Sequence, residues 1–294
     1  MISGLPFTAT LAVSLLFTFV SGAVDEGLNE VKYGYSGETA PDQWGNLTPI
    51  FGTCSSGKHQ SPVNIIQNEC AVNKTLAPLN MTYHSGNASM MSSGLVVGVH
   101  YEASVGDLII DGKKYHFTQM HWHAPSEHLI DGERYAAELH LVHEADDQTY
   151  AVVAVIYQYG KPNSLINKFK KPLVKLGEEQ CTGLGSLHKV PLGIFNTRRM
   201  KKPVHKYYRY VGSLTTPPCS ESVTWSVLAN VKTISKEQVE ELKAPLCPGC
   251  KENARPVQEL NGRRVELYSD EQGQQQLQQQ QLEKKRRAAK RSRS

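Results

Sequence analysis

The stretch Gln119-Met120-His121-Trp122-His123-Ala124-Pro125-Ser126-Glu127-His128 decides how this chain is interpreted, together with the later stretch Ala136-Ala137-Glu138-Leu139-His140-Leu141-Val142-His143. Successive side chains of a β-strand alternate between its two faces, so residues two apart point the same way. Gln119, His121 and His123 therefore share one face of the first stretch, and Glu138 and His140 share one face of the second. If the two stretches are neighbouring strands of one sheet, three imidazoles converge on a single point.

Histidines that converge in this way are typical of a catalytic metal site. Three neutral imidazoles with an open fourth position form a zinc site, and polar groups behind the ligands orient them. Gln119 and Glu138 each lie two residues before a histidine and on the correct face for that task. A lone histidine on a strand is more often an ordinary polar residue, which is what we expect of His128 and His143. His116 falls on the opposite face of its strand and is not expected to be a ligand.

Five segments resemble, in order, those of the α-class carbonic anhydrases: Gln60-Ser61-Pro62-Val63-Asn64-Ile65, His121–His128, Ala137–His143, Gly212-Ser213-Leu214-Thr215-Thr216-Pro217-Pro218 and Asn253-Ala254-Arg255-Pro256. The resemblance runs from about Tyr33 to about Leu267, and its motifs are specific in combination. The secreted, plant-type members are most similar, notably in the motif His-Trp-His-x-Pro-Ser-Glu-His.

The resemblance implies an activity and a cofactor. The activity is the reversible hydration of carbon dioxide to bicarbonate and a proton, carried out by hydroxide on a bound Zn²⁺. The implied metal ligands are His121, His123 and His140. The family pattern further implies that Thr215 accepts a hydrogen bond from the zinc hydroxide and passes one to Glu127, while Thr216 lines the same wall.

Further residues would surround the metal. The groups implied to orient the ligands are Gln119, Glu138 and the carbonyl of Asn253. Carbon dioxide is apolar, and the residues that match its apolar wall are Val142, Val152, Leu214 and Trp225, with Tyr35 reaching the cavity. The same residues could equally be plain core. One departure stands out, because Leu95 occupies the position of the histidine that exports protons in fast members. Leucine cannot carry a proton, and a relay at neutral pH normally needs histidine, so we expect slow proton export.

Two other functions fit part of the pattern. Cupins also use His-x-His-x₃-Glu and a distant histidine to bind manganese or iron, which would make Glu127 a ligand, but the glycines of the cupin motifs are absent. The second is a carbonic-anhydrase-like storage or defence protein with weak or no activity, as in some tuber storage proteins of the family. The glutamine-rich C-terminal segment and Leu95 fit that role, whereas the complete set of three histidines favours an enzyme.

The composition and the periodicity predict one mainly β domain over residues 24–270. With 39% hydrophobic and 20% charged residues, the 294-residue chain can form a sizeable core. Short strands separated by Gly, Asn and Asp are expected at 94–101, 107–110, 115–121, 136–143 and 150–157. Helices are expected at 161–176 and 235–242, the second capped by Ser235. The resemblance implies a large, mostly antiparallel twisted central sheet with a few short peripheral helices.

The two ends of the chain differ in composition from the domain. Residues 1–23 are typical of a signal peptide, with an apolar run at 11–20 and small residues at 21–23, although a basic start is missing and a membrane anchor is the rival. No later stretch is apolar enough to span a bilayer. Residues 271–294 form a Gln-rich and basic tail that we expect to be disordered. Behind a secretion signal the tail would contact acidic wall polymers or anionic lipid, and no nucleic acid is expected.

Secretion agrees with two further features. Asn73, Asn80 and Asn87 begin glycosylation sequons. The six cysteines suggest disulfides in an oxidising compartment, and the resemblance implies a bridge between Cys54 and Cys219. The pairing of the other four cysteines, Cys70, Cys181, Cys247 and Cys250, stays open, with a local or mixed disulfide expected at Cys247-Pro248-Gly249-Cys250. The expected location is the secretory pathway, ending in the cell wall or extracellular space, or in a plastid or vacuole reached through it.

Overall fold

A computed structural model describes residues 32–179, 181, 183–184, 187–200 and 203–270. The predicted signal peptide (1–23) and the predicted basic tail (271–294) both lie outside the described residues. Within the described part, no helix combines the length and the apolar character needed to cross a bilayer.

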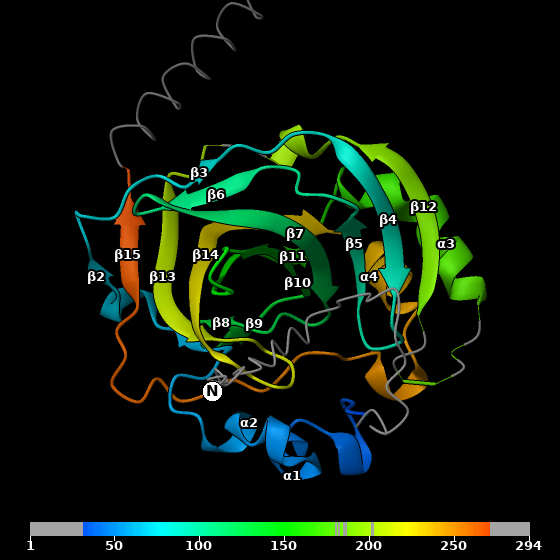
Figure 1. Ribbon diagram of the computed structural model, residues 1–294, viewed down its shortest axis with the longest axis horizontal. Helices are drawn as coiled ribbons and strands as arrows, with labels where there is room; N and C mark the ends of the chain where they lie inside the picture. Colours follow the sequence, from blue (N-terminus) through cyan, green and yellow to red (C-terminus); the bar gives the residue numbers. More distant parts are fainter. Residues whose placement is uncertain (1–31, 180, 182, 185–186, 201–202, 271–294) are drawn as a thin grey trace, which may run out of the picture. The chain divides into compact units, whose positions relative to one another are not determined.

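A large mixed sheet dominates the described residues, and most of its neighbouring strands are antiparallel (Figure 1). Its strands follow the order β12 (His188–Phe195), β4 (Gly86–Ser92), β5 (Val97–Tyr101), β7 (Lys113–His123), β10 (Ala137–Glu144), β11 (Tyr150–Tyr159), β14 (Glu221–Ile234), β13 (Lys206–Ser213), β15 (Glu266–Ser269) and β2 (Ala71–Val72). The pairs β11–β14 and β15–β2 are parallel. In addition, β6 (Asp107–Ile110) pairs with β7 and with β3 (Asn80–Met81). The predicted fold class is confirmed.

A small second sheet and a few short helices complete the fold. The small sheet has the order β1 (Asn64–Ile65), β8 (Leu129–Ile130) and β9 (Glu133–Arg134). The α-helices are α1 (Trp44–Leu47), α2 (Thr53–Ser56), α3 (Lys170–Glu178) and α4 (Lys236–Lys243). The short 3-10 helices are η1 (Gly37–Thr39), η2 (Pro49–Phe51), η3 (Gln67–Glu69), η4 (Ile166–Phe169), η5 (Thr197–Met200) and η6 (Pro248–Cys250). Figure 1 shows α3 and α4 beside β4 and β12.

The first predicted helix begins later than expected, whereas the second begins as expected. The sequence predicted a helix over 161–176, but α3 starts at Lys170 and is preceded by the 3-10 turn Ile166–Phe169. Pro172 has no N–H to donate and is tolerated only in the first turn of a helix, which agrees with a start at Lys170. The second helix, α4, begins after Ser235, whose side chain accepts a hydrogen bond from the Gln238 N–H in a capping box.

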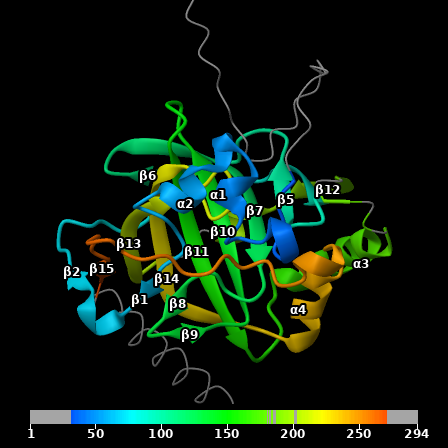
Figure 2. The same cartoon turned by 90° about the horizontal axis from the view of Figure 1, so that it is seen from below.

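The strands β7, β10 and β11 run alongside one another at the centre of the sheet (Figure 2). Their alternating side chains separate two environments. One face contributes to the main hydrophobic core, in which Trp122, Leu139 and Val153 are buried. The other face carries a row of directly paired residues across β7, β10, β11 and β14, namely Gln119, Val142, Val152 and Trp225. The next row on this face contains His121 and His140.

A β-bulge corrects one prediction about these faces. The register between β7 and β10 shifts between Val142 and His143, because β7 has one extra residue there. A bulge of this kind inverts the alternation beyond it. His116 consequently pairs with Glu144 on the same face as Val142, so its predicted placement on the opposite face was wrong. His116 is nevertheless engaged elsewhere, because Asp107 and Asp146 lie 2.8 and 3.2 Å from its ring nitrogens.

The cysteines form two disulfides among the described residues. Cys54 is bonded to Cys219, and Cys181 is bonded to Cys247. Cys70 and Cys250 are free thiols. A local bond within the Cys247–Cys250 segment is therefore absent, because Cys247 is joined to a residue 66 positions earlier. The Cys54–Cys219 bridge ties α2 to the loop that carries Thr215 and Thr216.

Candidate metal centre

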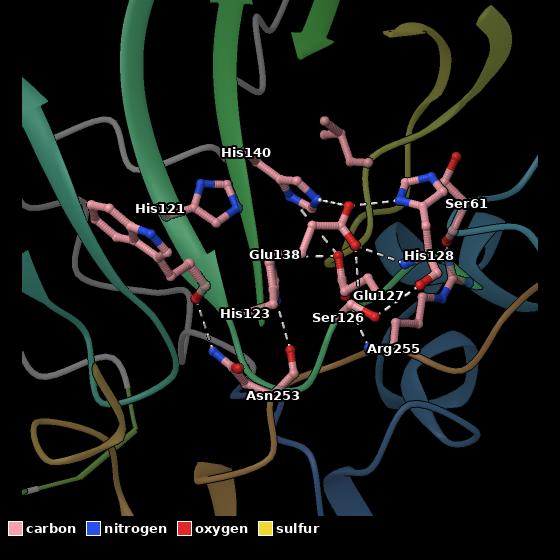
Figure 3. A network of polar contacts seen from close by, with 12 residues as sticks. Ser61, His121, His123, Ser126, Glu127, His128, Glu138, His140, Asn253 and Arg255 are labelled. Carbon is pink, nitrogen blue, oxygen red and sulfur yellow. Dashed lines mark hydrogen bonds and ion pairs between the residues drawn. The ribbon is translucent and has the colours of Figure 1, made fainter. Parts of the chain in front are cut away.

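The three predicted histidine ligands meet at one point between β7 and β10 (Figure 3). His121 pairs directly with His140, so their side chains project from the same face, and His123 lies two residues further along β7. One ring nitrogen from each residue belongs to a group whose atoms all lie within 4.8 Å of one another. The ring centroids are 5.0, 5.2 and 4.8 Å apart.

The second nitrogen of each ring is held by an oxygen of the protein. Nδ1 of His121 donates to Oε1 of Gln119 at 2.8 Å, and Nδ1 of His123 donates to the carbonyl of Asn253 at 2.7 Å. Nε2 of His140 donates to Oε1 of Glu138 at 2.7 Å. An oxygen acceptor at one nitrogen places the proton there and leaves the lone pair of the other nitrogen free. Each ring thus presents an unprotonated nitrogen to the common point.

Burial keeps these histidines neutral. Burial lowers the pKa of His121 well below its ordinary value, with the nearby His123 and His140 adding to the effect. Burial likewise lowers the pKa of His123 to about 4 and shifts the pKa of His140 downward. Nε2 of His123 is buried and has no hydrogen-bond partner among the described residues. A buried polar atom without a partner needs an explanation, and a bound metal ion at this point would supply one, so the residues present fit zinc.

Glu138 organises the polar groups behind the histidines. Its Oε2 accepts hydrogen bonds from the backbone N–H groups of Glu127 and His128 at 2.9 and 2.8 Å. Its Oε1 accepts from the rings of His140 and His128. Burial alone would raise the pKa of this carboxyl, but the two histidines outweigh it and hold the pKa well below its usual value. His128, Glu138 and His140 also lie within metal-binding distance of one another, and these hydrogen bonds account for that spacing.

Glu127 lies beside the histidines but outside their group. Its Oε1 accepts from the backbone N–H of Arg255 at 2.9 Å, and its Oε2 lies 3.4 Å from Nε2 of His123. Burial raises the pKa of Glu127 to about 7, while His140 and the side chain of Thr215 act in the opposite direction. The three-histidine group does not include Glu127, which argues against the four-ligand cupin arrangement.

Two residues that support the site were not singled out by the sequence analysis. Arg255 is buried, and its guanidinium donates to Oε1 of Gln60 at 2.9 Å and to the carbonyls of Ser61 and Cys54 at 2.8 Å each. Tyr210 lies 2.7 Å from Nε2 of His128 through its hydroxyl. Arg255 falls inside the quoted segment Asn253–Pro256, so a signal for it existed. Tyr210 lies two residues before the quoted segment that begins at Gly212, and nothing marks it in the sequence.

The predicted apolar residues lie on the metal-facing side. Val142 pairs with Val152, which pairs with Trp225, so these three side chains share one face of the sheet. The Trp225 ring centroid lies 4.9 Å from that of His140, and the indole N–H donates to the Ser213 carbonyl at 3.0 Å. Together they form an apolar wall next to the imidazoles.

The loop after β13 carries Leu214, Thr215 and Thr216, and the Thr215 side chain lies within hydrogen-bonding reach of Glu127. The N–H of Cys219 donates to the Thr216 carbonyl at 2.9 Å, closing the turn. Leu214 and Thr215 are buried. Tyr35 packs its ring edge-on against Trp44, with 5.6 Å between the ring centroids. Burial raises the pKa of Tyr35 well above its ordinary value, and the charge of Glu127 contributes. Tyr35 therefore lies within electrostatic reach of the centre.

Leu95 lies in the turn between β4 and β5. It is buried in a small cluster with Cys247 and Cys250, against which Tyr33, Tyr35 and Leu184 pack. His100 is the only nearby histidine of β5, and it pairs with Gln119, which places it on the face of the metal centre. Burial, with a smaller effect of Lys189, lowers the pKa of His100 to about 4.

The predicted glycosylation sites differ in accessibility. Asn80 and Asn87 are exposed. Asn73 is half-buried, and its side-chain amide donates to Glu266 at 3.0 Å. Attachment of a glycan is therefore easier at the first two positions than at Asn73.

Together, the fold and the site define a single β-rich domain with a buried three-histidine centre on one face of a large twisted sheet. The chain belongs to the eukaryotic-type carbonic anhydrase family, whose model matches residues 39–269. The resemblance expected from the motifs is confirmed.

Known proteins of two kinds are similar along most of their length. Alpha carbonic anhydrase 7 of Arabidopsis thaliana is 35% identical over 91% of this chain and 96% of its own. Dioscorin DB3L of Dioscorea polystachya is 31% identical over 89% of this chain and 94% of its own. Among solved structures, dioscorin complexed with ascorbate matches with a TM-score of 0.76 at 32% identity, covering 81% of this chain and 98% of that one. The α-carbonic anhydrase from Thermovibrio ammonificans, complexed with the inhibitor sulfanilamide, matches with a TM-score of 0.68 at 33% identity, covering 80% and 99%.

Proposed function

We propose that this protein catalyses the reversible hydration of carbon dioxide at a zinc ion held by His121, His123 and His140. One observation carries the proposal: three neutral ring nitrogens face a common point, and each ring is fixed from behind by an oxygen. Zinc held by three histidines supplies a hydroxide nucleophile near neutral pH. Membership of the carbonic anhydrase family supports the same reaction.

The chain's own residues would orient the reactants. Thr215 lies close enough to Glu127 to lower the pKa of its carboxyl, so the threonine hydroxyl can donate to that carboxylate. Its own oxygen then remains free to accept a hydrogen bond, which would fix the direction of the nucleophile. Thr216 is the next residue of the same loop and would line the same wall of the site. The wall of Val142, Val152 and Trp225 excludes water and offers apolar carbon dioxide a surface beside the metal.

Proton export would be the slow step. Leu95 has no ionisable group and is buried against Tyr33 and Tyr35. His100 faces the same side, but its pKa of about 4 makes it a poor proton acceptor at neutral pH. We therefore propose that buffer in solution, rather than a side chain, takes up the proton during turnover.

The function is tested by measuring zinc content and hydration activity of the purified protein together. We expect about one zinc ion per chain, as a three-histidine catalytic site binds, and hydration that sulfanilamide inhibits. The variant His123→Ala should lose both zinc and activity, whereas His84→Ala, at an exposed histidine bonded to a backbone carbonyl, serves as the matched control. A zinc-loaded protein without hydration activity would refute the proposal.

The proton-export step has a separate test. The hydration rate of the wild type should rise steeply with imidazole concentration, because free imidazole can replace the missing relay. In Leu95→His the rate at low buffer should rise by about tenfold or more, in line with the 10²–10⁴-fold range of general acid–base catalysis. A wild-type rate that is already high and independent of buffer would contradict the proposal.

A storage or defence role is the second candidate. The observations that favour it are the buried leucine at position 95 and the similarity to dioscorins, relatives that are not named carbonic anhydrases. Zinc-free protein with no hydration activity in the test above would support this role.

The proposed setting is the secretory pathway. Two disulfides among the described residues and similarity to plant α-carbonic anhydrases are compatible with it. We further propose cleavage after residue 23, glycans at Asn73, Asn80 and Asn87, and contact of the basic tail with acidic wall polymers or anionic lipid. Mass spectrometry of the native protein would test the cleavage and the glycans.

A further inference from the structure

A cavity lies on the face of the sheet opposite the metal centre. It encloses about 920 Å³, which is within the range of small-molecule pockets. We call it the rear pocket and define it by its floor, Leu139, Leu141, Val153, Val155 and Leu228. We propose that the rear pocket binds a small amphipathic anion, a molecule with an apolar body and a single carboxylate-type head.

The floor of the rear pocket is apolar because of strand alternation. Leu139 and Leu141 of β10 alternate with His140 and point to the other side of the sheet. They pair directly with Val155 and Val153 of β11, and Val155 pairs with Leu228 of β14. The floor can therefore bury an aliphatic or aromatic body. The same strands, β10, β11 and β14, carry Val142, Val152 and Trp225 on their opposite, metal-facing side.

The rim of the rear pocket is positively charged. Lys168 and Lys232 line it, together with His205. Lys206 also borders the pocket, but it alternates with Tyr207, which pairs with Leu228 of the floor, so its side chain projects to the other face of β13. No Asp or Glu occurs among the described residues that line the pocket. The carboxylate of Asp270 lies 3.3 Å from Nδ1 of His205. An apolar floor beside two lysine ammonium groups is complementary to an anionic head on an apolar body.

The charge also argues against the chain's own C-terminal segment as the occupant. The described residues end at Asp270, whose N–H donates at 2.7 Å to the carbonyl of His205, a residue that lines the rear pocket. Residues 284–294 contain seven Lys or Arg and no acidic residue. Like charges repel across a surface of this kind, so a separate anion fits the lysines better than this segment does.

The proposal is tested by titrating the full-length protein with octanoate in a calorimeter, below the concentration at which octanoate forms micelles. The comparison ligands are 1-octanol, which lacks the charge, octyltrimethylammonium, which reverses it, and acetate, which lacks the apolar body. Each titration is repeated after dialysis against a zinc chelator, because a carboxylate can also bind to a metal.

Octanoate should bind about tenfold or more tightly than each comparison ligand, since a charge-assisted contact contributes about that factor. Lys168→Gln and Lys232→Gln should each weaken octanoate binding by several-fold to about tenfold, and leave octanol binding unchanged. The matched control is Lys171→Gln, an exposed lysine of α3 outside the pocket lining. Removal of the metal should change nothing.

Two variants that fill the pocket locate the ligand. Leu228→Trp fills it from the floor, and Ser164→Trp fills it from an exposed position of the lining, in case the floor variant does not fold. Either one, if folded by circular dichroism, should weaken octanoate binding. Three results would each overturn the proposal. They are normal octanoate binding by a folded variant whose pocket is filled, octanol binding as tight as octanoate binding, and loss of octanoate binding when the chelator removes the metal. Binding that appears only after deletion of residues 271–294 would show instead that the chain's own segment occupies the pocket.

Discussion

Glu138 accepts four hydrogen bonds, from the rings of His140 and His128 and from the backbone N–H groups of Glu127 and His128. Gln119 accepts one from His121. Groups that orient metal ligands typically contribute 10–100-fold to metal affinity. We therefore expect Glu138→Gln to weaken zinc binding by about 100-fold and Gln119→Leu by about tenfold, measured by competition with a chelator. Equal effects of the two substitutions would show that the number of hydrogen bonds is not what matters.

His143 gives the stability a predictable dependence on pH. Its Nδ1 donates to the Ala151 carbonyl at 3.1 Å, and its Nε2 accepts from the Tyr83 hydroxyl at 2.5 Å. Burial lowers its pKa from 6.5 to about 4, with backbone hydrogen bonds acting in the opposite direction. As the pH falls below 6.5, the unfolded chain binds a proton at this residue and the folded chain does not, so stability is lost until about pH 4. The loss amounts to about 3 kcal/mol.

The measurement compares urea unfolding of the wild type and His143→Gln between pH 7 and pH 4.5. The glutamine does not titrate, so the wild type should lose more unfolding free energy than the variant over this range. Parallel pH profiles for the two proteins would mean that His143 makes no such contribution.

At the scale of the element, α4 depends on the N-cap residue that precedes it, Ser235. The Ser235 side chain accepts from the Gln238 N–H, and the Gln238 side chain accepts from the Ser235 N–H, each at 3.3 Å. Replacing a capping serine with alanine typically costs about 1 kcal/mol. We expect that loss in the free energy of unfolding for Ser235→Ala, measured with denaturant. Lys236→Ala, an exposed position one residue later, should change it little.

The presence of the strands was easier to predict than the residues at which they begin and end. The range Asp107–Ile110 was predicted as it occurs. The central strands β7 and β11 are longer than predicted, and β10 has the predicted length but begins and ends one residue later. Alternation of apolar and polar residues identifies the middle of a strand, whereas its ends depend on where the neighbouring strand stops. The bulge in β7 also could not be predicted from the sequence, because nothing in the sequence marks the one extra residue. That residue nevertheless places His116 on the other face of the sheet.

At the scale of the whole molecule, the Cys54–Cys219 bridge closes a loop with a sequence separation of 165. A cross-link over so long a loop lowers the entropy of the unfolded chain, which stabilises the folded state by up to about 5 kcal/mol in the chain-entropy model. We expect the double variant Cys54→Ala/Cys219→Ala to lose about 2–5 kcal/mol in the free energy of unfolding. Hydration activity should fall as well, because the bridge holds the loop of Thr215 and Thr216.

The control for this experiment is Cys70→Ala, which removes a free, half-buried thiol that closes no loop. Urea unfolding of this variant should match that of the wild type closely. A double variant as stable as the control would mean that the loop is restrained by its noncovalent contacts, such as the Gln60 amide donating to the Cys219 carbonyl at 3.0 Å.

The sequence by itself determined the β class and the shared face of the histidines, because alternation along a strand follows from backbone geometry and is visible in any stretch of residues. The family was indicated by the resemblance of five motifs. Only the tertiary structure decided that Cys181 pairs with Cys247, that a bulge moves His116 to the metal-facing side of the sheet, and that β10 separates a polar site from an apolar pocket. These features arise where distant segments meet, and their contacts depend on the register and packing of the whole sheet rather than on any local pattern.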